Sequence, residues 1–100
     1  MSANERKVQL DLNFPTFLDD LLDIDVIYLK KVLKTLKKLR SLTWQQVYSD
    51  PGLKWEEMKY KSGHYTIRLS DSCRAIAIRH EQWMRFYRIS VEHDGAYGKK

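Results

Sequence analysis

The chain has 100 residues, of which 43% are hydrophobic and 31% are charged. This length supports one domain with a single modest core, and the composition is that of a globular rather than a disordered chain. No run of about 18 apolar residues exists that would form a membrane helix, and the N-terminus is too polar for a signal peptide. The single cysteine, Cys73, cannot form an internal disulfide, which fits a reducing compartment. We therefore expect a cytoplasmic protein with no membrane partner.

The net charge of +5 is distributed unevenly along the chain. Residues 1–25 carry two basic and six acidic groups, whereas residues 26–100 carry sixteen basic and seven acidic groups. An acidic start before a basic body favours a polyanionic partner, and nucleic acid is the leading candidate. A solvated, lysine-rich helix accounts for the same charge and is the alternative.

The first half of the chain predicts one strand followed by two helices. Residues 1–6 are polar and are expected to fray. Residues 7–14 alternate apolar and polar side chains, which is typical of a half-buried strand, and Pro15 ends this pattern. Apolar residues then recur at helical spacing over residues 16–22 and, more regularly, over residues 26–39. The second helix has a lysine face, which is typical of a solvated surface but can also bind a partner.

The second half predicts a third, short helix and then a series of strands. Ser41 or Thr43 is a suitable N-cap for a helix over residues 44–48, and residues 50–52 (Asp-Pro-Gly) favour a turn. Strands are expected at residues 54–61, 65–69, 74–79 and 83–91. Because short turns join them, these strands form an antiparallel meander, and the apolar run at residues 74–79 is its central strand.

Together these elements predict an α+β domain in two layers that spans residues 1–100. Its order is β-α-α-β-β-β, with an antiparallel sheet covered on one face by two helices. The uncovered face then carries the polar residues. Four large aromatic residues are assigned to the core: Trp44, Trp55, Trp83 and Phe86.

The sequence contains no metal or cofactor motif. Its histidines, His64, His80 and His93, stand sixteen and thirteen residues apart and match no zinc pattern. Residues 92–94 (Glu-His-Asp) are adjacent, but neighbouring strand residues point to opposite faces and cannot easily share an ion. A phosphate-binding glycine loop and a G-x-S-x-G motif are also absent. We therefore predict no metal, no cofactor, and neither nucleotide hydrolysis nor acyl transfer.

Basic residues are frequent in the predicted sheet, and tyrosines lie between them. The arginine fork suits phosphate, and the tyrosine ring can stack on a base, so this sheet is equipped for single-stranded RNA. Core packing is the alternative for each aromatic residue. Arg85 and Arg88 are the weakest functional candidates among the arginines. The full set is Lys54, Lys59, Lys61, Arg68, Arg74, Arg79, Arg85 and Arg88, with Tyr60, Tyr65, Tyr87 and Tyr97.

The same residue types can cleave RNA. Cleavage through the 2′-hydroxyl requires removal of a proton, stabilisation of a pentavalent phosphate and protonation of the leaving oxygen. Arginine can hold the developing charge, and histidine or tyrosine can move the protons. His93 and Tyr97 follow the last predicted strand, where a tail can place both against the basic face. The alternative for His93 is a solvated loop residue paired with Asp94.

The element order, the Y-x-I-R-L-S strand at residues 65–70, the C-R-A-I-A-I strand at residues 73–78 and the H-D-G-A-Y ending at residues 93–97 occur together. This combination resembles the RelE/ParE toxin superfamily, and within it the RelE- and HigB-like RNase branch, over residues 7–97. The resemblance implies a small cytoplasmic bacterial toxin that cleaves mRNA on the ribosome without a metal. It also implies a cognate antitoxin that neutralises the toxin.

Carried onto the matching positions, the resemblance implies roles for individual residues. Arg68 and Arg74 would contact the phosphate and stabilise the transition state. His93 and Tyr97 would act as acid, base or stacking group. The basic face of the helix at residues 30–40 would meet ribosomal RNA or an acidic antitoxin segment. The residues expected to support RNA binding are Lys54 and Lys59 from the resemblance, with Lys61 and Arg79 from the charge pattern.

Two other functions remain open. The ParE branch inhibits DNA gyrase and lacks the RNase residues, and the presence of His93 with Tyr97 favours the RNase branch instead. A basic RNA-binding or regulatory module without catalysis is the third possibility. Such a module would bind RNA with a steep salt dependence and leave the strand uncut.

Overall fold

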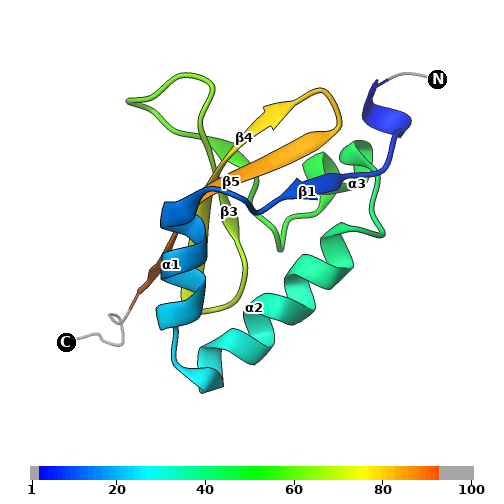
Figure 1. Cartoon of the computed structure of the whole chain (residues 1–100). Coiled ribbons are helices and arrows are strands. Elements are labelled where there is room, and N and C mark those ends of the chain that lie inside the picture. The colour runs from blue at the N-terminus through cyan, green and yellow to red at the C-terminus, as the bar shows by residue number, and fades with distance from the viewer. Residues whose placement is uncertain (1–2, 93–100) are drawn as a thin grey trace.

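The computed structural model describes residues 3–92, and within them five strands form one sheet in the spatial order β1-β5-β4-β3-β2 (Figure 1). In chain order the elements are η1 (a 3-10 helix, Ala3–Glu5), β1 (Gln9–Asp11), α1 (Pro15–Asp23), α2 (Val26–Leu39), α3 (Trp44–Ser49), β2 (Glu56–Glu57), β3 (Tyr65–Arg68), β4 (Cys73–His80) and β5 (Trp83–Val91). None of the helices in this part of the chain combines the length and the apolar character needed to cross a membrane.

The predicted α+β class, with helices layered on a mostly antiparallel sheet, is confirmed. Strands β2 to β5 form the predicted antiparallel meander. Strand β1 differs from the prediction because it pairs with β5 in parallel. A parallel pair requires a long connection between its strands, and the three helices and the meander together provide that connection.

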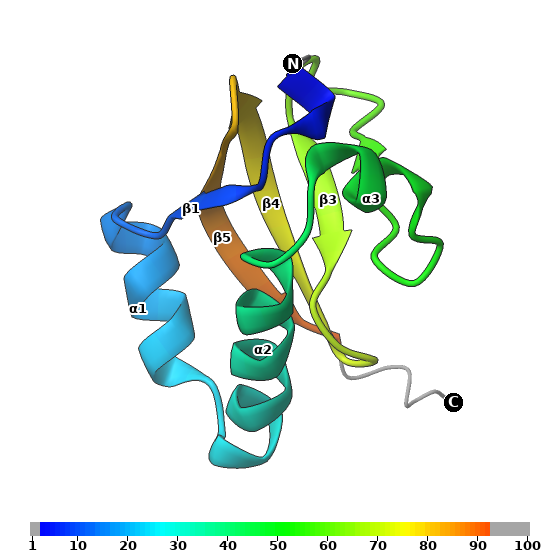
Figure 2. The ribbon, with the colours of Figure 1, turned by 90° about the vertical axis from the view of Figure 1, so that its right-hand side faces the viewer.

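The register of β3, β4 and β5 divides their side chains between two faces. Ile67, Ala75 and Ile89 are cross-strand neighbours and all three are buried on the face that the helices cover (Figure 2). Arg68 and Arg74 oppose each other on the other face, which we call the open face. Because successive strand residues alternate between faces, each strand contributes to the core and to the open face.

Helices α2 and α3 form as predicted. Helix α2 has the predicted bounds and buries Val32, Leu36 and Leu39. The predicted cap Thr43 starts α3: its side chain accepts a hydrogen bond from the Gln46 N–H at 3.2 Å, and the Gln46 side chain accepts one from the Thr43 N–H at 2.8 Å. This reciprocal capping box satisfies two backbone donors that the helix leaves unpaired. Helix α3 adds a third helix to the two in the predicted layer.

Helix α1 covers the part of the β5 edge that β1 leaves unpaired. Strand β1 pairs only with residues 83–85 of β5. Further along, the Thr16 hydroxyl donates to the Tyr87 carbonyl at 2.8 Å. The Asp20 carboxylate accepts from the Ile89 N–H at 2.9 Å. Thr16 and Asp20 are four residues apart and share one side of the helix, so α1 satisfies backbone groups that would otherwise invite pairing with another chain.

The N-terminal segment departs from its predicted structure. The predicted strand at residues 7–14 is reduced to β1, because the Val8 N–H donates instead to the Leu42 carbonyl at 2.9 Å. At the other end of β1, the Asp11 carboxylate accepts from the Asn13 N–H at 3.1 Å, a local turn that ends the strand. The segment before β1, which is expected to fray, contains η1.

The predicted strand at residues 54–61 is reduced to β2. Lys54 has a φ of 51°, in the left-handed region, which interrupts an extended backbone. After β2, the Lys61 N–H donates to the Met58 carbonyl at 3.4 Å and the His64 N–H donates to the Lys61 carbonyl at 3.1 Å. Residues 58–64 therefore form a looped connection to β3.

The prediction that Trp83 lies in the core is wrong. Trp83 is predicted to lie in the core but is 40% exposed, whereas Trp44 and Phe86 are fully buried and Trp55 is half-buried. The physical reason is strand alternation: Met84 points into the core and is fully buried, so its neighbour Trp83 faces the other way.

Candidate nucleic-acid interface on the open sheet face

Arg68 and Arg74 meet at one end of the open face. They occupy directly opposed positions on β3 and β4. On the far side of Arg74, the small residue Ser90 of β5 occupies the opposed position. Two like charges placed directly opposite each other on neighbouring strands destabilise a sheet unless an anion compensates them. The arginine pair is therefore a candidate site for a bound anion.

The carboxylates that pair with these two arginines are themselves exposed. Arg68 Nη2 lies 3.1 Å from Asp71 Oδ1, and Arg74 Nε lies 3.2 Å from Glu92 Oε2. The side chains of Asp71 and Glu92 are 85% and 52% exposed, and ion pairs at such positions contribute little stability. A phosphate can replace either carboxylate, because a guanidinium group binds both with the same fork of donors.

Arg85 and Arg88 are held differently on the same face. Arg85 Nε lies 3.0 Å from Asp11 Oδ2. Arg88 donates two hydrogen bonds to Asp20, at 2.9 and 3.1 Å. The side chains of Asp11 and Asp20 are only 17% and 18% exposed. These arginines connect β5 to β1 and α1, a structural role that agrees with their low rank as functional candidates.

Hydrogen bonds keep the two enclosed carboxylates ionised. The backbone N–H of Asn13 is the main cause of the lowered pKa of Asp11, with a further contribution from Arg85. For Asp20, the hydrogen bonds from Arg88 lower the pKa most, and the Ile89 N–H adds to them. Both effects outweigh the desolvation that raises a carboxyl pKa.

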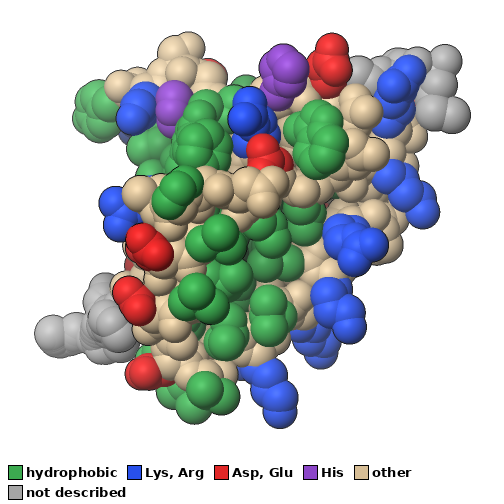
Figure 3. Space-filling model, in the orientation of Figure 1, with side chains coloured by type: hydrophobic (Ala, Val, Ile, Leu, Met, Phe, Trp, Pro, Cys, Tyr) green, Lys and Arg blue, Asp and Glu red, His purple; other side chains and the backbone are tan. Residues whose placement is uncertain are grey.

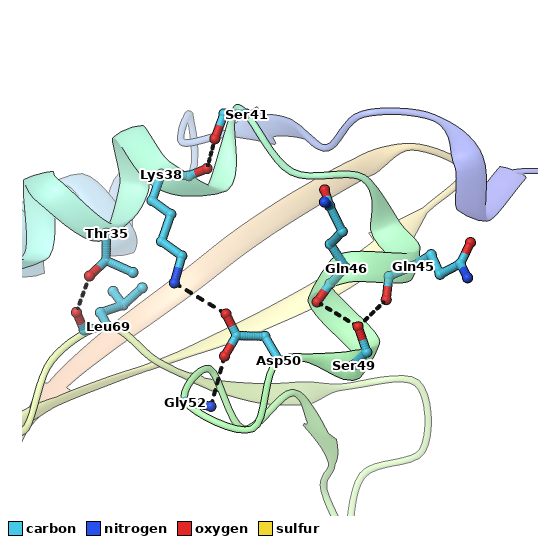
Figure 4. Close-up of polar contacts among 9 residues, drawn as sticks. All are labelled: Thr35, Lys38, Ser41, Gln45, Gln46, Ser49, Asp50, Gly52 and Leu69. Atoms are coloured by element: carbon cyan, nitrogen blue, oxygen red, sulfur yellow. Dashed lines mark hydrogen bonds and ion pairs between the residues drawn. The ribbon is translucent and has the colours of Figure 1, made fainter.

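A cleft of about 290 Å³ opens beside Arg68 and contains a second cation, Lys38 of α2. Lys38 Nζ lies 3.1 Å from Asp50 Oδ2 (Figure 4). Burial raises the pKa of Asp50, but the hydrogen bonds from Lys38 and the following turn outweigh burial, and the pKa is lowered. The Thr35 hydroxyl donates to the Leu69 carbonyl at 2.6 Å and joins α2 to the end of β3. Helix α2 therefore places a lysine that is already paired with Asp50 in the cleft beside Arg68.

A second cleft, of about 260 Å³, lies at the opposite end of the open face. It is lined by Asp11, Asn13, His80, Trp83 and Arg85. The exposed indole ring of Trp83 suits a stacked base. His80 opposes Trp83 in the register and lies six positions along β4 from Arg74, so the arginine pair and this cleft are about 20 Å apart.

His64 and Tyr87 lie between the two ends of the open face. Their rings stack with centroids 5.7 Å apart, and the Tyr87 ring also lies 4.1 Å from the ring of Phe14. Tyr87 is unpaired in the register because β5 has a bulge there. The sequence interpretation missed His64 as a site residue. Its signal was the strand period of two, because His64 is four residues before Arg68.

The three lysines predicted to support RNA binding lie in two places. Lys54 follows Leu53, whose carbonyl accepts a hydrogen bond from the Arg68 N–H at 2.7 Å, so its backbone lies beside the arginine pair. Lys59 and Lys61 are exposed in the loop that leads into β3, at the strand end away from Arg68.

Arg79 points to the helix-covered side of the sheet. Its guanidinium carbon lies 4.3 Å from the centre of the Trp44 ring. Its donors reach the Asn4 side chain at 2.8 Å, the Tyr48 hydroxyl at 3.2 Å and the Glu81 carbonyl at 2.7 Å. Arg79 therefore fastens η1 and α3 to the β4–β5 hairpin, and the structure does not bring it to the open face.

His93 and Tyr97, the predicted proton carriers, lie outside the described residues, and their roles stay predictions. Among residues 3–92, no three His, Cys, Asp or Glu side chains gather in a way that could hold a metal ion. What the described residues offer is anion binding by arginine at one end of the open face and an exposed aromatic ring at the other.

Comparison with known proteins gives matches only at the level of structure. No protein-family model and no curated protein matches the sequence. A chain of the RelB–RelE antitoxin–toxin complex from Methanococcus jannaschii aligns with a TM-score of 0.58 and 18% identity, over 84% of this chain and 89% of that one. YafQ from Escherichia coli strain BL21(DE3) aligns with a TM-score of 0.58 and 17% identity, over 92% of this chain and 100% of YafQ. A chain of the E. coli DinJ–YafQ toxin–antitoxin complex aligns with a TM-score of 0.58 and 15% identity, over 93% of this chain and 100% of that one.

The chain has the fold of the RelE and YafQ toxins. The resemblance inferred from the strand motifs is therefore confirmed for the fold. At identities of 15 to 18%, the likeness reaches no further than the arrangement of the elements. Activity has to be argued from the residues on the open face.

Proposed function

We propose that this chain is the toxin of a toxin–antitoxin pair and that it cleaves mRNA on the ribosome as a metal-independent endoribonuclease. The Arg68–Arg74 pair carries this proposal: two opposed guanidinium groups on the open face, each paired with an exposed carboxylate. A site of this kind suits the phosphate of an RNA strand. The RelE and YafQ fold supports the toxin role.

The proposed reaction balances within the RNA strand. The 2′-oxygen loses its proton and attacks the adjacent phosphorus, the bond from phosphorus to the 5′-oxygen breaks, and that oxygen takes up a proton. The products are a 2′,3′-cyclic phosphate and a 5′-hydroxyl. Arg68 and Arg74 would stabilise the extra negative charge on the phosphoryl oxygens in the transition state. His93 and Tyr97 are the proposed proton carriers.

The open face would hold the RNA on both sides of the cleaved bond. The scissile phosphate would lie at the arginine pair, and the strand would continue along the face toward Trp83. Lys54 would contact the backbone near the arginine pair, whereas Lys59 and Lys61 would contact it from the loop before β3. This assignment explains why a large aromatic side chain is exposed at the end of the hairpin, where a base can stack on it.

An antitoxin is the proposed protein partner. The structural matches include complexes named as RelB–RelE and DinJ–YafQ, and we extend that association to this chain. An antitoxin would neutralise the toxin by binding it before it reaches the ribosome.

Induced expression of the wild type and of arginine variants tests the proposal. The wild type should arrest growth and produce mapped breaks in translated mRNA. Arg68→Ala and Arg74→Ala should each reduce cleavage by about 100-fold or more, because each removes a donor to the transition-state charge. Arg6→Ala is the matched control, since Arg6 is exposed and lies between η1 and β1, whereas the arginine pair lies on β3 and β4.

The other outcomes identify the alternatives. If the wild type is harmless and leaves translated mRNA intact, the proposal is wrong. Inhibition of gyrase supercoiling without mRNA cleavage would show a ParE-like inhibitor. RNA that is bound but never cut would show a non-catalytic module.

A further inference from the structure

A carboxylate holds Arg85 at the Trp83 end of the open face without using the outer end of the guanidinium group. Arg85 Nε lies 3.0 Å from Asp11 Oδ2, and Arg85 donates no other hydrogen bond within residues 3–92. Both Nη groups therefore lack a hydrogen-bond partner in that part of the chain, and the side chain is 44% exposed. Because the charge of Asp11 balances that of Arg85, this cleft suits a neutral ligand with acceptor atoms better than a phosphate.

Asn13 supplies an acceptor to the same cleft. Its backbone N–H and its side-chain Nδ2 both donate to Asp11 Oδ1, at 3.1 and 3.0 Å. The lowered pKa of Asp11 keeps its carboxyl group ionised, so this group can only accept and the amide must turn Nδ2 toward it. Asn13 Oδ1 is then the atom left over, and no donor within residues 3–92 bonds to it. Two donors and one acceptor are thus available to a ligand.

Trp83 and His80 place flat rings beside these polar groups. They occupy directly opposed positions on β5 and β4, and Trp83 is 40% exposed. Figure 3 shows hydrophobic, basic, acidic and histidine side chains meeting on the surface near the end of this hairpin. The volume of the cleft, about 260 Å³, falls just below the roughly 300 to 1,000 Å³ of sites for drug-sized ligands. The cleft therefore suits one planar ring system better than a complete nucleotide.

We propose that this cleft binds a guanine base of the RNA strand, which rests on the proposed function for the identity of the strand. The base would stack on Trp83. Its O6 and N7 atoms would accept hydrogen bonds from the Nη groups of Arg85, the pairing by which arginine commonly reads guanine. Its N1–H group would donate to Asn13 Oδ1. We call the cleft the guanine site.

The pattern of donors and acceptors separates guanine from the other bases. Adenine has an amino group where guanine has O6, so a donor of Arg85 would face another donor. The N1 atom of adenine carries no hydrogen and would face the Asn13 acceptor. Cytosine and uracil have no N7 atom and a smaller ring to stack. Only guanine satisfies Arg85 and Asn13 together.

The surroundings of the guanine site favour a strand over a free nucleotide. Arg85 is the only lysine or arginine among the described residues that line it, and Asp11 already balances its charge. An RNA strand would have its phosphate contacts at the arginine pair, about 20 Å away. Successive nucleotides of a stacked strand are about 3.4 Å apart along the axis. The guanine would therefore lie several nucleotides from the cleaved bond and would select where the strand binds.

Non-cleavable strands that differ in one base test the guanine site. Each strand is a 2′-O-methyl oligouridine long enough to span the open face, with guanine, adenine or 7-deazaguanine at its centre. Fluorescence anisotropy with the full chain should show the guanine strand binding about five- to 160-fold tighter than the adenine strand. The 7-deazaguanine strand, which lacks the N7 acceptor, should bind about tenfold weaker than the guanine strand. Equal affinity for guanine and adenine strands would overturn the proposal.

Arg85→Lys locates the base contact, because lysine keeps the charge and removes the fork of donors. This variant should bind the guanine strand no more than about twofold tighter than the adenine strand, while its affinity for the adenine strand matches the wild type. Arg88→Lys is the matched control: Arg88 lies on the same strand and also pairs with a carboxylate, but outside the cleft. It should keep the wild-type preference. A preference for guanine that survives in Arg85→Lys would refute the assignment.

Two further variants distinguish base reading from stacking and from a disturbed fold. Asn13→Ala, at an exposed position, should reduce the preference for guanine by about two- to tenfold, because it removes one acceptor. It tests the site independently if Arg85→Lys disturbs the pairing of β1 with β5. Trp83→Ala should weaken both strands by a similar factor, because stacking accepts any base. A full preference for guanine in Asn13→Ala would remove that residue from the site.

The remaining measurements separate the sources of the base and the two proposals. Competition by GMP as effective as that by the guanine strand would assign the site to a free nucleotide and count against a strand. The loss in Arg85→Lys should be equal at low and high salt, whereas a loss confined to low salt would indicate a phosphate contact instead. A wild type that prefers guanine but leaves translated mRNA uncut would contradict the proposed function alone. One that cuts mRNA without preferring guanine would contradict the guanine site alone.

Discussion

At the scale of single residues, the arginines of the open face differ in what neutralises them. Asp11 and Asp20 are well enclosed and hold Arg85 and Arg88 in place. Arg68 and Arg74 have exposed partners and can exchange them for phosphate. The sequence shows five arginines with similar surroundings, because the carboxylates that distinguish them come from β1 and α1, about 70 positions away in the chain. Only the tertiary fold separates the two kinds.

Trp83 provides a prediction at this scale. Trp83→Ala should weaken binding of single-stranded RNA by about five- to 160-fold, because stacking on an aromatic ring contributes about 1 to 3 kcal/mol per base. Stability should change little, since the side chain is 40% exposed. Equilibrium binding of a labelled oligonucleotide measures the effect. Leu22→Ala removes an exposed apolar side chain of α1 that lies away from the open face, and it should leave the affinity within about twofold of the wild type. Equal losses in both variants would contradict a specific stacking site.

At the scale of elements, α1 acts as a cover for the edge of β5. A helix in this place was predictable from its apolar spacing and Pro15. Its role was not, because Thr16 donates a hydrogen bond to β5 and Asp20 accepts one from it, and each bond joins residues about 70 positions apart. The same holds for η1, which the sequence describes as a polar end and the fold attaches to Arg79 through Asn4.

A substitution at Asp20 tests how much the contact between α1 and β5 stabilises the fold. Asp20→Ala should lower the free energy of unfolding at neutral pH by about 1 to 3 kcal/mol, since removal of the enclosed carboxylate leaves the Ile89 N–H without its acceptor. Because folding lowers the pKa of Asp20, the stabilisation from its ionised form is complete above the unfolded pKa of about 3.9 and is lost as the pH falls through the folded pKa. Urea unfolding at pH 7 and at pH 3 should therefore show a smaller difference between wild type and variant at pH 3. Asp19→Ala, on the exposed side of the same helix, should behave like the wild type at both values; a constant difference for Asp20→Ala would contradict this account.

At the scale of the whole molecule, the sequence predicts the fold class better than it predicts which face of the sheet each side chain takes. The α+β layers, the meander and the bounds of α2 follow from periodicity and short turns. The alternation along β4 also indicated which face each side chain takes. Arg79 is an even number of residues from Cys73 and Ala77, which are buried, and an odd number from Arg74, so it points to the same face as the buried pair. The bulge at Tyr87 and the φ of Lys54 could not be anticipated in this way, because both depend on how neighbouring segments meet.

RNA is assigned to the open face of the sheet. Charge on this face should therefore control the salt dependence of RNA binding. For a single strand, the logarithm of the binding constant falls with the logarithm of the salt concentration by about 0.7 per neutralised phosphate.

Removing one arginine from the pair should reduce that slope by about 0.7. Arg68→Ala and Arg74→Ala are the test variants, measured with a non-cleavable single-stranded oligonucleotide over a salt series. Arg85→Ala should change the slope less, because Asp11 already neutralises that arginine, and Arg6→Ala should leave the slope unchanged. If Arg6→Ala lowers the slope as much as Arg74→Ala does, the RNA responds to net charge and not to the arginine pair.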